Sequence, residues 1–236
     1  MKRALAAWLL SLSLPLLLEG CAGALQWNAP QDGAALESAP ASYVVKPGDT
    51  LYSISWRYGL DYHDVSSWNK LGPDYIIHPG DKLRLQAPVS SSQRAAPYTP
   101  VKRVDDRLPP SSGPLQWAWP VQGSVVRSFH AGSRLATGVD ITAPQGTEIR
   151  AASSGKVVYA GSGIIGYGKL IIIKGSEAFL SAYADNDQIL VKEGDMVRIG
   201  DRIATMGLGR DSRPVLHFEI RYQGKPVDPL GYLPRK

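Results

Sequence analysis

Apolar and polar positions follow three different patterns along the chain. An almost unbroken apolar run, "ALAAWLLSLSLPLLL", follows Lys2 and Arg3. Between Tyr43 and Leu85, a short β-branched run is followed by apolar residues at helical spacing. From Leu115 onward, short β-rich runs such as "GKVVYAG", "GKLIIIKG" and "DRIATMG" are separated by glycine turns. The patterns predict a targeting segment, a small mixed module and a larger β domain.

The N-terminal apolar run is too short and too close to the start for a comfortable membrane span, and it is typical of a secretory signal. It ends at Cys21, the single cysteine of the 236 residues, so no disulfide can form within the chain. A buried thiol is one interpretation. The small residue before Cys21 also resembles the lipobox of bacterial lipoproteins, from which Glu19 departs. That resemblance implies removal of residues 1–20, lipidation of Cys21 and, because Ala22 follows, an anchor on the periplasmic face of the outer membrane.

Residues 43–86 are predicted to form a strand, two short helices and a second strand. The elements are indicated by the turn at Pro47-Gly48-Asp49, by Leu51, Ile54 and Tyr58 on one helix face, by Val65 and Trp68 in a second helix, and by Pro79-Gly80 before Lys82–Leu85.

The phrases "VVKPGDTLYSIS" and "WNKLGPDYIIHPGDKLRL" within this segment resemble the LysM module over its whole length. The resemblance implies a groove that binds the N-acetylglucosamine-containing glycan of peptidoglycan. On this chain the groove would be formed by Gly48, Asp49, Thr50, Leu51, Asn69, Ile77 and Pro79. The glycine-aspartate pairs also suit a purely structural role, as turns with Thr50 capping a helix. Both roles can hold together.

Two stretches rich in Pro, Ser and small residues separate the patterned segments. Residues 21–42 are predicted to be a flexible tether and residues 87–114 a linker. Extended like polyproline, the linker would reach on the order of 85 Å. We therefore expect the last domain to search well beyond the module that precedes it.

Residues 115–236 are predicted to form a mainly antiparallel all-β domain. The phrases "TGVDITAPQGTEIRAASSGKVVYAG", "GYGKLIIIKG", "EGDMVRIGDRIATMG" and "LHFEIRYQGKPVDPLGYLP" resemble the lysostaphin-type, or LytM, zinc endopeptidase domain over nearly its full length. Active members of that family carry two zinc ligands in His-x-x-x-Asp and a catalytic His after a Tyr-Ala pair. Their His-x-His motif supplies another catalytic group and the third ligand.

Three of these five active-site positions are replaced in the present chain. The replaced positions are Ala136, Asp185 and Val215, and the kept ones are Asp140 and His217. A catalytic zinc normally takes three protein ligands and a water, and valine cannot donate a hydrogen bond to an oxyanion. We therefore expect no zinc, no other cofactor and no peptidase activity. An atypical metal site would have to recruit His130 or Asp185, and His130 lies outside the motif register.

The closing strand of this domain remains regular despite the replacements. Alternation places His217, Glu219 and Arg221 on one face and Phe218, Ile220 and Tyr222 on the other. Without metal chemistry, the cleft is most simply a binding site. Its predicted partner-binding residues are Asp140, Tyr183, Asp185, Val215, His217, Glu219 and Arg221.

The order of lipidated terminus, LysM module, linker and degenerate LytM domain resembles the NlpD-type lipoproteins. That resemblance implies a peptidoglycan-binding protein that activates N-acetylmuramoyl-L-alanine amidases as daughter cells separate. Two alternatives stay open: a zinc endopeptidase with an atypical site, and a structural tether between outer membrane and wall. The net charge of +5 suits the anionic wall but does not by itself distinguish wall, phospholipid and nucleic acid. We expect no nucleic-acid partner.

Overall fold

The computed structural model describes residues 38–88, 115–133 and 136–235. The predicted signal segment, Cys21 and most of both low-complexity stretches lie outside these residues. No helix in the described ranges has the length and hydropathy that crossing a membrane requires. The elements are β1 (Ser42–Val44), α1 (Leu51–Tyr58), α2 (Tyr62–Asn69), β2 (Lys82–Arg84), β3 (Ser124–Arg127), β4 (Val139–Thr142), β5 (Glu148–Arg150), β6 (Gly155–Gly161), β7 (Lys169–Lys174), β8 (Phe179–Ile189), β9 (Met196–Val197), β10 (Arg202–Met206), β11 (Leu216–Tyr222), β12 (Lys225–Val227) and the 3-10 turn η1 (Pro229–Gly231).

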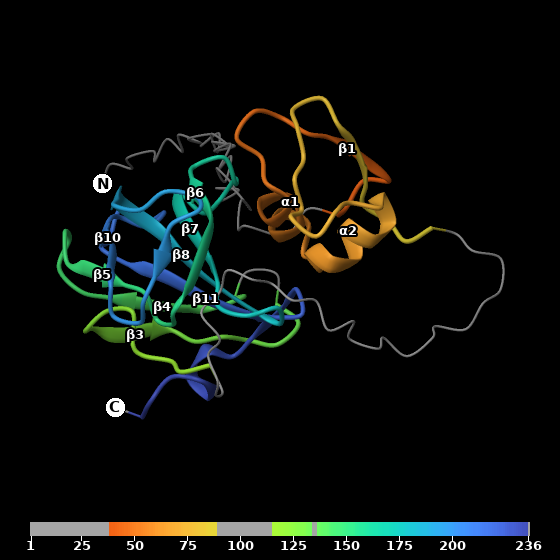
Figure 1. Cartoon of the computed structure of the whole chain (residues 1–236). Coiled ribbons are helices and arrows are strands. Elements are labelled where there is room, and N and C mark those ends of the chain that lie inside the picture. The colour runs from red at the N-terminus through yellow and green to blue at the C-terminus, as the bar shows by residue number, and fades with distance from the viewer. Residues whose placement is uncertain (1–37, 89–114, 134–135, 236) are drawn as a thin grey trace, which may run out of the picture. The chain divides into compact units, whose positions relative to one another are not determined.

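The first module is specified by local signals in its own sequence. Strands β1 and β2 pair antiparallel, and helices α1 and α2 lie beside them (Figure 1). Thr50 and Ser53 form a capping box at the start of α1: the Ser53 amide donates to Thr50 Oγ1 at 3.0 Å, and the Thr50 amide donates to Ser53 Oγ at 2.9 Å. Gly59, with φ of 64°, ends α1 in the left-handed region. The predicted strand-helix-helix-strand order is confirmed.

The C-terminal domain is built around one large antiparallel sheet. Its strands follow the order β3-β4-β11-β8-β7-β6-β9, while β10 joins β8 to β5 and β12 pairs with β11. Each of the described strand pairs is antiparallel. The predicted mainly antiparallel all-β domain is confirmed, and β7, β8 and β11 run through its centre (Figure 1).

The central strand β7 is apolar on both faces of the sheet. On β7, Ile171 and Ile173 belong to an inner core formed by the domain itself. Leu170 and Ile172 point to the other face and belong to a second core, which also contains Trp56 and other LysM residues. A strand that is covered on both sides has a nearly continuous apolar run, as in "LIII" here. Because the two modules share this second core, the expectation of a C-terminal domain that works far from LysM is wrong for this structure.

Candidate functional site

A cleft of about 610 Å³ is lined by four of the five LytM motif positions, namely Asp140, Asp185, Val215 and His217. Its walls come from β3, β4, β8 and β11 and from the loop between β10 and β11. The strand register explains the convergence, because His217 on β11 lies opposite Asp140 on β4 and opposite Ala184 on β8. Asp185, the next residue on β8, also lines the cleft, because its left-handed backbone (φ of 61°) interrupts the alternation of faces along the strand.

A continuous series of charged contacts leads from the cleft into the protein. Arg127 Nη2 lies 2.8 Å from Asp140 Oδ2, and His217 Nδ1 lies 2.7 Å from Asp140 Oδ1. His217 Nε2 lies 3.0 Å from Glu219 Oε1, and Arg221 Nη2 lies 3.1 Å from Glu219 Oε2. We call these five residues the charged stripe. They alternate in sign, so each carboxylate lies between two cationic groups.

The charged stripe sets the protonation of its members. Burial would lower the pKa of His217, but its bonds to Asp140 and Glu219 outweigh burial and raise that pKa to about 9. Burial would raise the pKa of Glu219, but Arg221 and His217 hold it at about 2. In the same way His217 and Arg127 lower the pKa of Asp140 against the effect of burial. At neutral pH His217 is therefore an imidazolium between two carboxylates.

The residues of the cleft do not fit a catalytic zinc ion. Zinc binds neutral imidazole and normally three protein ligands, whereas both ring nitrogens of His217 face carboxylates and both oxygens of Asp140 have partners. Among the described residues, no group of three or more His, Cys, Asp or Glu is arranged to hold a metal. His130, considered above as a substitute ligand, has its Nδ1 3.1 Å from the Ser128 carbonyl and does not line the cleft.

Asp185 is held in the cleft by a constrained backbone. Its φ of 61° lies in the left-handed region, which is uncommon for a residue other than glycine. Its amide donates to the Tyr167 carbonyl, and its carbonyl accepts from the Gly207 amide, both at 3.0 Å. Burial raises the pKa of Asp185 to about 6, with a further contribution from Asp140. Backbone strain of this kind collects at functional sites, which favours a role for this carboxyl.

The other two replaced positions present methyl groups. Val215 lies in the cleft wall and packs against Gly209. A Cβ atom added to residue 209 would come within 2.5 Å of Val215 Cγ1. Ala136 is buried and does not line the cleft. Its amide donates to Ser133 Oγ at 3.0 Å, and its carbonyl accepts from the His130 amide at 3.1 Å. Neither side chain offers a donor or a metal ligand.

Four of the seven predicted partner-binding residues line the cleft, namely Asp140, Asp185, Val215 and His217. The other three are buried elsewhere. Tyr183 lies in the inner core, and its hydroxyl accepts from the Ala152 amide at 2.8 Å. Glu219 and Arg221 are on the predicted face of β11, but that face is covered, and Arg221 is only 1% exposed. The alternation on β11 predicted the direction of these side chains correctly but not their burial.

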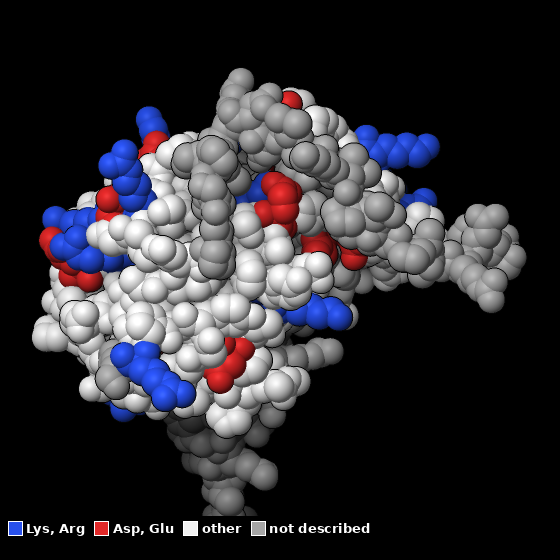
Figure 2. All heavy atoms as spheres, turned by 60° about the horizontal axis from the view of Figure 1, so that its bottom comes forward, with Lys and Arg blue, Asp and Glu red and all other residues white. Residues whose placement is uncertain are grey.

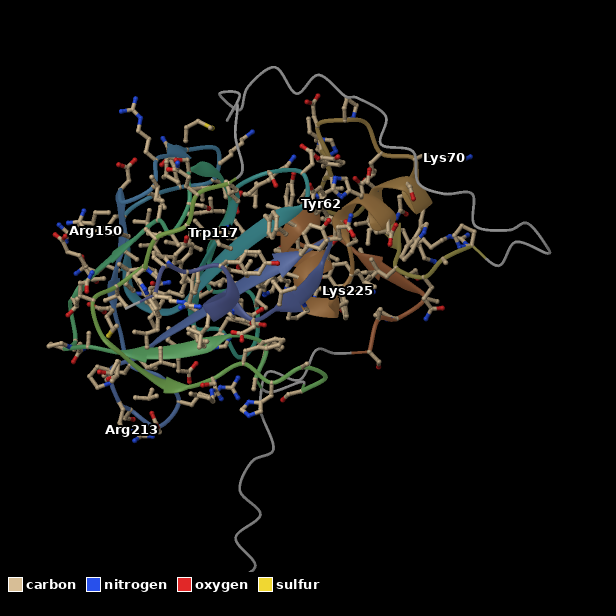
Figure 3. The ribbon with its side chains drawn as sticks, turned by 90° about the horizontal axis from the view of Figure 1, so that it is seen from below. Tyr62, Lys70, Trp117, Arg150, Arg213 and Lys225 are labelled. Atoms are coloured by element: carbon tan, nitrogen blue, oxygen red, sulfur yellow. The ribbon has the colours of Figure 1, made fainter. Side chains whose placement is uncertain are left out.

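The cleft also contains three arginines that the motif comparison did not indicate: Arg127, Arg210 and Arg213. Arg210 Nη2 donates to the Gly166 carbonyl at 2.9 Å. Arg213 pairs with Asp211, and its side chain is 82% exposed at the edge of the domain (Figure 3). The charged run "RDSR" just before β11 was the available sequence signal.

The predicted glycan-binding residues differ in their exposure. Gly48 and Pro79 are exposed, and Asp49, Thr50 and Ile77 are partly exposed. Leu51 is buried in the LysM core. Asn69 joins α2 to β2, because its Nδ2 donates to the Val65 carbonyl at 2.7 Å and its Oδ1 accepts from the Arg84 amide at 2.7 Å. Leu51 and Asn69 therefore have structural roles in the module.

Charges of both signs lie close together on the protein surface. In the face shown by Figure 2, Lys and Arg atoms adjoin Asp and Glu atoms along one edge, and most of the rest is uncharged. Glu148, for example, pairs with both Arg150 and Arg202. Over the described residues of that face there is no continuous basic field of the kind that nucleic-acid binding uses.

Comparison with known proteins gives matches over both modules. Residues 134–229 match Peptidase family M23, and residues 43–86 match the LysM domain. The lipoprotein NlpD/LppB homolog of Pseudomonas aeruginosa is 38% identical over 244 residues, which cover 89% of this chain and 82% of that protein. The uncharacterized lipoprotein YgeR of Escherichia coli is 41% identical over 233 residues, covering 94% and 90%. The murein hydrolase activator NlpD of Escherichia coli is 32% identical over 259 residues, covering 83% and 68%.

Proposed function

We propose that this chain, which belongs to the NlpD/LppB family of lipoproteins with LysM and M23 domains, binds peptidoglycan and activates a cell-wall amidase. In this proposal it does not cut the wall itself. The observation that carries the proposal is the charged stripe. The two remaining ligand residues, Asp140 and His217, are bound to each other, to Arg127 and to Glu219. A cleft with its ligand atoms satisfied in this way suits a binding partner better than a metal ion.

The amidase segment that controls access to its active site is the proposed occupant of the cleft. Methyl groups of Val215 offer an apolar contact, while Asp185, Arg210 and Arg213 offer charged contacts at the walls. A segment bound here would be displaced from the amidase active site. The amidase population would shift toward its open form if the cleft binds the released segment better than the segment in its closed position. A relative named as a murein hydrolase activator supports this assignment.

Wall binding is assigned to the LysM module, and membrane attachment to a lipid on Cys21. The glycan groove would use the exposed and partly exposed members of the predicted set other than Asn69, namely Gly48, Asp49, Thr50, Ile77 and Pro79. Relatives named as lipoproteins support the anchor, which would hold the protein at the periplasmic face of the outer membrane. In this arrangement the lipid and the glycan groove keep the cleft near peptidoglycan.

The central test measures dye release from labelled sacculi by the amidase alone, by the mature chain alone, and by both. We expect the mixture to exceed the sum of its parts and the chain alone to release nothing. Dye release by the chain alone, if a chelator abolishes it, would favour the atypical zinc endopeptidase. A mixture that gives only the sum, across the organism's amidases, would favour the structural tether.

A matched pair of charge reversals tests whether the cleft is the contact surface. Arg210→Glu changes the cleft wall, whereas Arg198→Glu changes an exposed arginine that does not line it. Because like charges at an interface commonly cost several kcal/mol, Arg210→Glu should weaken stimulation about tenfold or more. Arg198→Glu should leave stimulation unchanged, and equal losses in both variants would argue against the cleft.

Wall binding is tested by sedimentation with insoluble peptidoglycan. Ile76→Asp alters an exposed side chain next to Ile77, and Val44→Asp alters a similarly exposed side chain elsewhere in the module. Ile76→Asp should reduce the bound fraction and Val44→Asp should not. If both variants bind peptidoglycan as well as the unaltered chain does, the assignment of the glycan groove is wrong.

A further inference from the structure

Arg221 is a buried cation whose partners come from both modules. Its guanidinium carbon lies 3.5 Å from the ring centroid of Trp56 on α1, and its Nη1 donates to the Trp56 carbonyl at 3.0 Å. Within its own domain it bonds to Glu219, and its Nη2 donates to the Tyr167 hydroxyl at 3.4 Å. Trp56 and Arg221 are each only 1% exposed. A desolvated cation stacked on indole is a strong and direction-dependent contact.

Apolar packing and close backbone contact surround this pair. The core around Trp56 includes Leu170 and Ile172 of β7, which would otherwise face solvent. In the turn between β11 and β12, a Cβ on Gly224 would lie 2.7 Å from Asp61 Cα, so only glycine permits this approach to the start of α2. The two modules are therefore in close contact around the buried Trp56–Arg221 pair.

Polar groups close the edge of the same contact. The Tyr62 hydroxyl donates to the Glu177 carbonyl at 3.1 Å, and His63 Nε2 lies 3.0 Å from Glu177 Oε2 (Figure 3 labels Tyr62). Lys174 of β7 also pairs with Glu177. A buried centre surrounded by hydrogen-bonded polar groups at its rim is typical of a specific interface between domains.

The charged stripe connects this contact to the cleft. Glu219 is fully buried, and its Oε1 also accepts hydrogen bonds from Thr137 Oγ1 at 2.7 Å and from the Tyr167 hydroxyl at 2.8 Å. Its other carboxylate oxygen, Oε2, pairs with the Arg221 guanidinium. If Trp56 withdrew, Arg221 would meet water and move, and a buried carboxylate would lose a charged partner. His217, the next member of the stripe, lies in the cleft wall.

We propose that the LysM module docks as a cap on the outer face of the C-terminal sheet, and that Trp56, acting through Arg221, is a positioning residue for the cleft. The module is then more than a wall anchor, because its docked state fixes the side chains with which the cleft meets its partner. The part that concerns activation rests on the proposed function. The docking and its effect on His217 do not.

Docking is tested in the mature chain with a protease site placed between residues 87 and 114. After cleavage, the two fragments of the unaltered protein should remain associated at micromolar concentration in gel filtration. Trp56→Ala should weaken the association about thirtyfold or more, because a desolvated cation–π contact and its packing are lost. Trp117→Ala, which removes a tryptophan from the other core, should leave it unchanged. Separation of the unaltered fragments would overturn the proposal.

The four histidines provide a second measurement in the uncut chain by NMR of their ring nitrogens. His63 reports the interface and His217 reports the cleft, while His78 and His130 serve as internal controls. Trp56→Ala and Arg221→Met should both shift His63 and His217 and leave the controls in place. Trp56→Phe, which keeps an aromatic ring, should restore most of the original positions. Unshifted His217 resonances in both variants would refute the coupling even if the fragments stay together.

Folding of the altered module and activation are followed separately. If Trp56→Ala unfolds LysM, the circular dichroism of the released fragment will show it, and Arg221→Met, which leaves LysM intact, then decides the coupling. Dye release with an amidase is the third readout. If the His217 resonances shift in the variants but the unaltered chain stimulates no amidase, the docking proposal is supported and the proposed function is refuted. Stimulation that survives Arg221→Met unchanged refutes the positioning role and leaves the proposed function standing.

Discussion

The two faces of the C-terminal sheet are both closed, but by different means. The inner face packs Ile171, Ile173 and Phe218 against apolar side chains of the same domain. Among the described residues, the buried charged side chains are Lys174, Glu219 and Arg221, and they lie on the other face. The outer face packs Ile172 beneath LysM and also buries the Glu219–Arg221 pair. Apolar packing tolerates shifts in position, whereas a buried ion pair requires its partners in one place. The difference indicates that the outer face is built to hold one particular neighbour in one orientation, a role that buried polar groups have in some other proteins.

Reversing the charge of Arg221 should break the outer face. Arg221→Glu places two buried carboxylates side by side beneath Trp56, so we expect a loss of about 3 to 5 kcal/mol in the free energy of unfolding. Urea denaturation of the mature chain measures it. Arg213→Glu is the control, because that arginine is largely exposed, and it should change stability by about 0.5 kcal/mol or less. Similar stability of both variants would mean that Arg221 is not buried in solution.

Two isoleucines on opposite faces of β7 sharpen the comparison. Ile171 lies in the inner core and Ile172 in the core shared with LysM, and both are fully buried. Each Ile→Ala change should therefore cost about 2 to 4 kcal/mol, because each leaves a cavity. Thermal or urea unfolding of the two variants gives the values. A cost below about 1 kcal/mol for Ile172→Ala alone would show that the outer face is open to water.

The sequence predicted those parts of the molecule that depend on local signals. Thr50 and Gly48 specify the first helix and its preceding turn, and glycine turns separate the strands of the C-terminal domain. Motif register also identified Asp140, Asp185, Val215 and His217 as neighbours in the cleft. These features need only short-range rules and a known family pattern.

The burial of Arg221 required information that alternation does not carry. A period of two assigns Glu219 and Arg221 to one face of β11, but it does not say what covers that face. Arg221 is covered by Trp56, which is far away in sequence and separated by the linker. The run Leu170–Ile173 did contain a signal, since four consecutive apolar residues on a strand indicate that both faces are buried.

The cleft end of the outer face should respond to pH through Asp185. Its pKa is raised from 3.8 to about 6, so the folded state holds this proton more tightly than the unfolded state. The stability that Asp185 contributes should therefore be lost as pH rises from about 4 to 6. Asp185→Asn should remove about 1 to 2 kcal/mol of that loss, measured as urea unfolding against pH. Glu219 has the opposite sign and a lower window, because its pKa of about 2 makes stability fall only as pH drops below about 4.5. An unchanged slope between pH 4 and 6 in Asp185→Asn would contradict the assignment.

The smallest expected effect concerns zinc, for which the cleft should have little affinity. A ligand present at a hundred times its dissociation constant would stabilise the folded state by about 2.7 kcal/mol. In contrast, we expect zinc or a chelator to change the melting temperature of the mature chain by less than about 1 °C, because His217 is an imidazolium bound to Asp140 and Glu219. Ala136→His is the matched variant, since it supplies the third ligand that the LytM pattern requires, and it should bind zinc more tightly than the unaltered chain. Elemental analysis after dialysis measures both. About one tightly held zinc per unaltered chain would show that the charged stripe opens to admit a metal, and it would favour the atypical zinc endopeptidase.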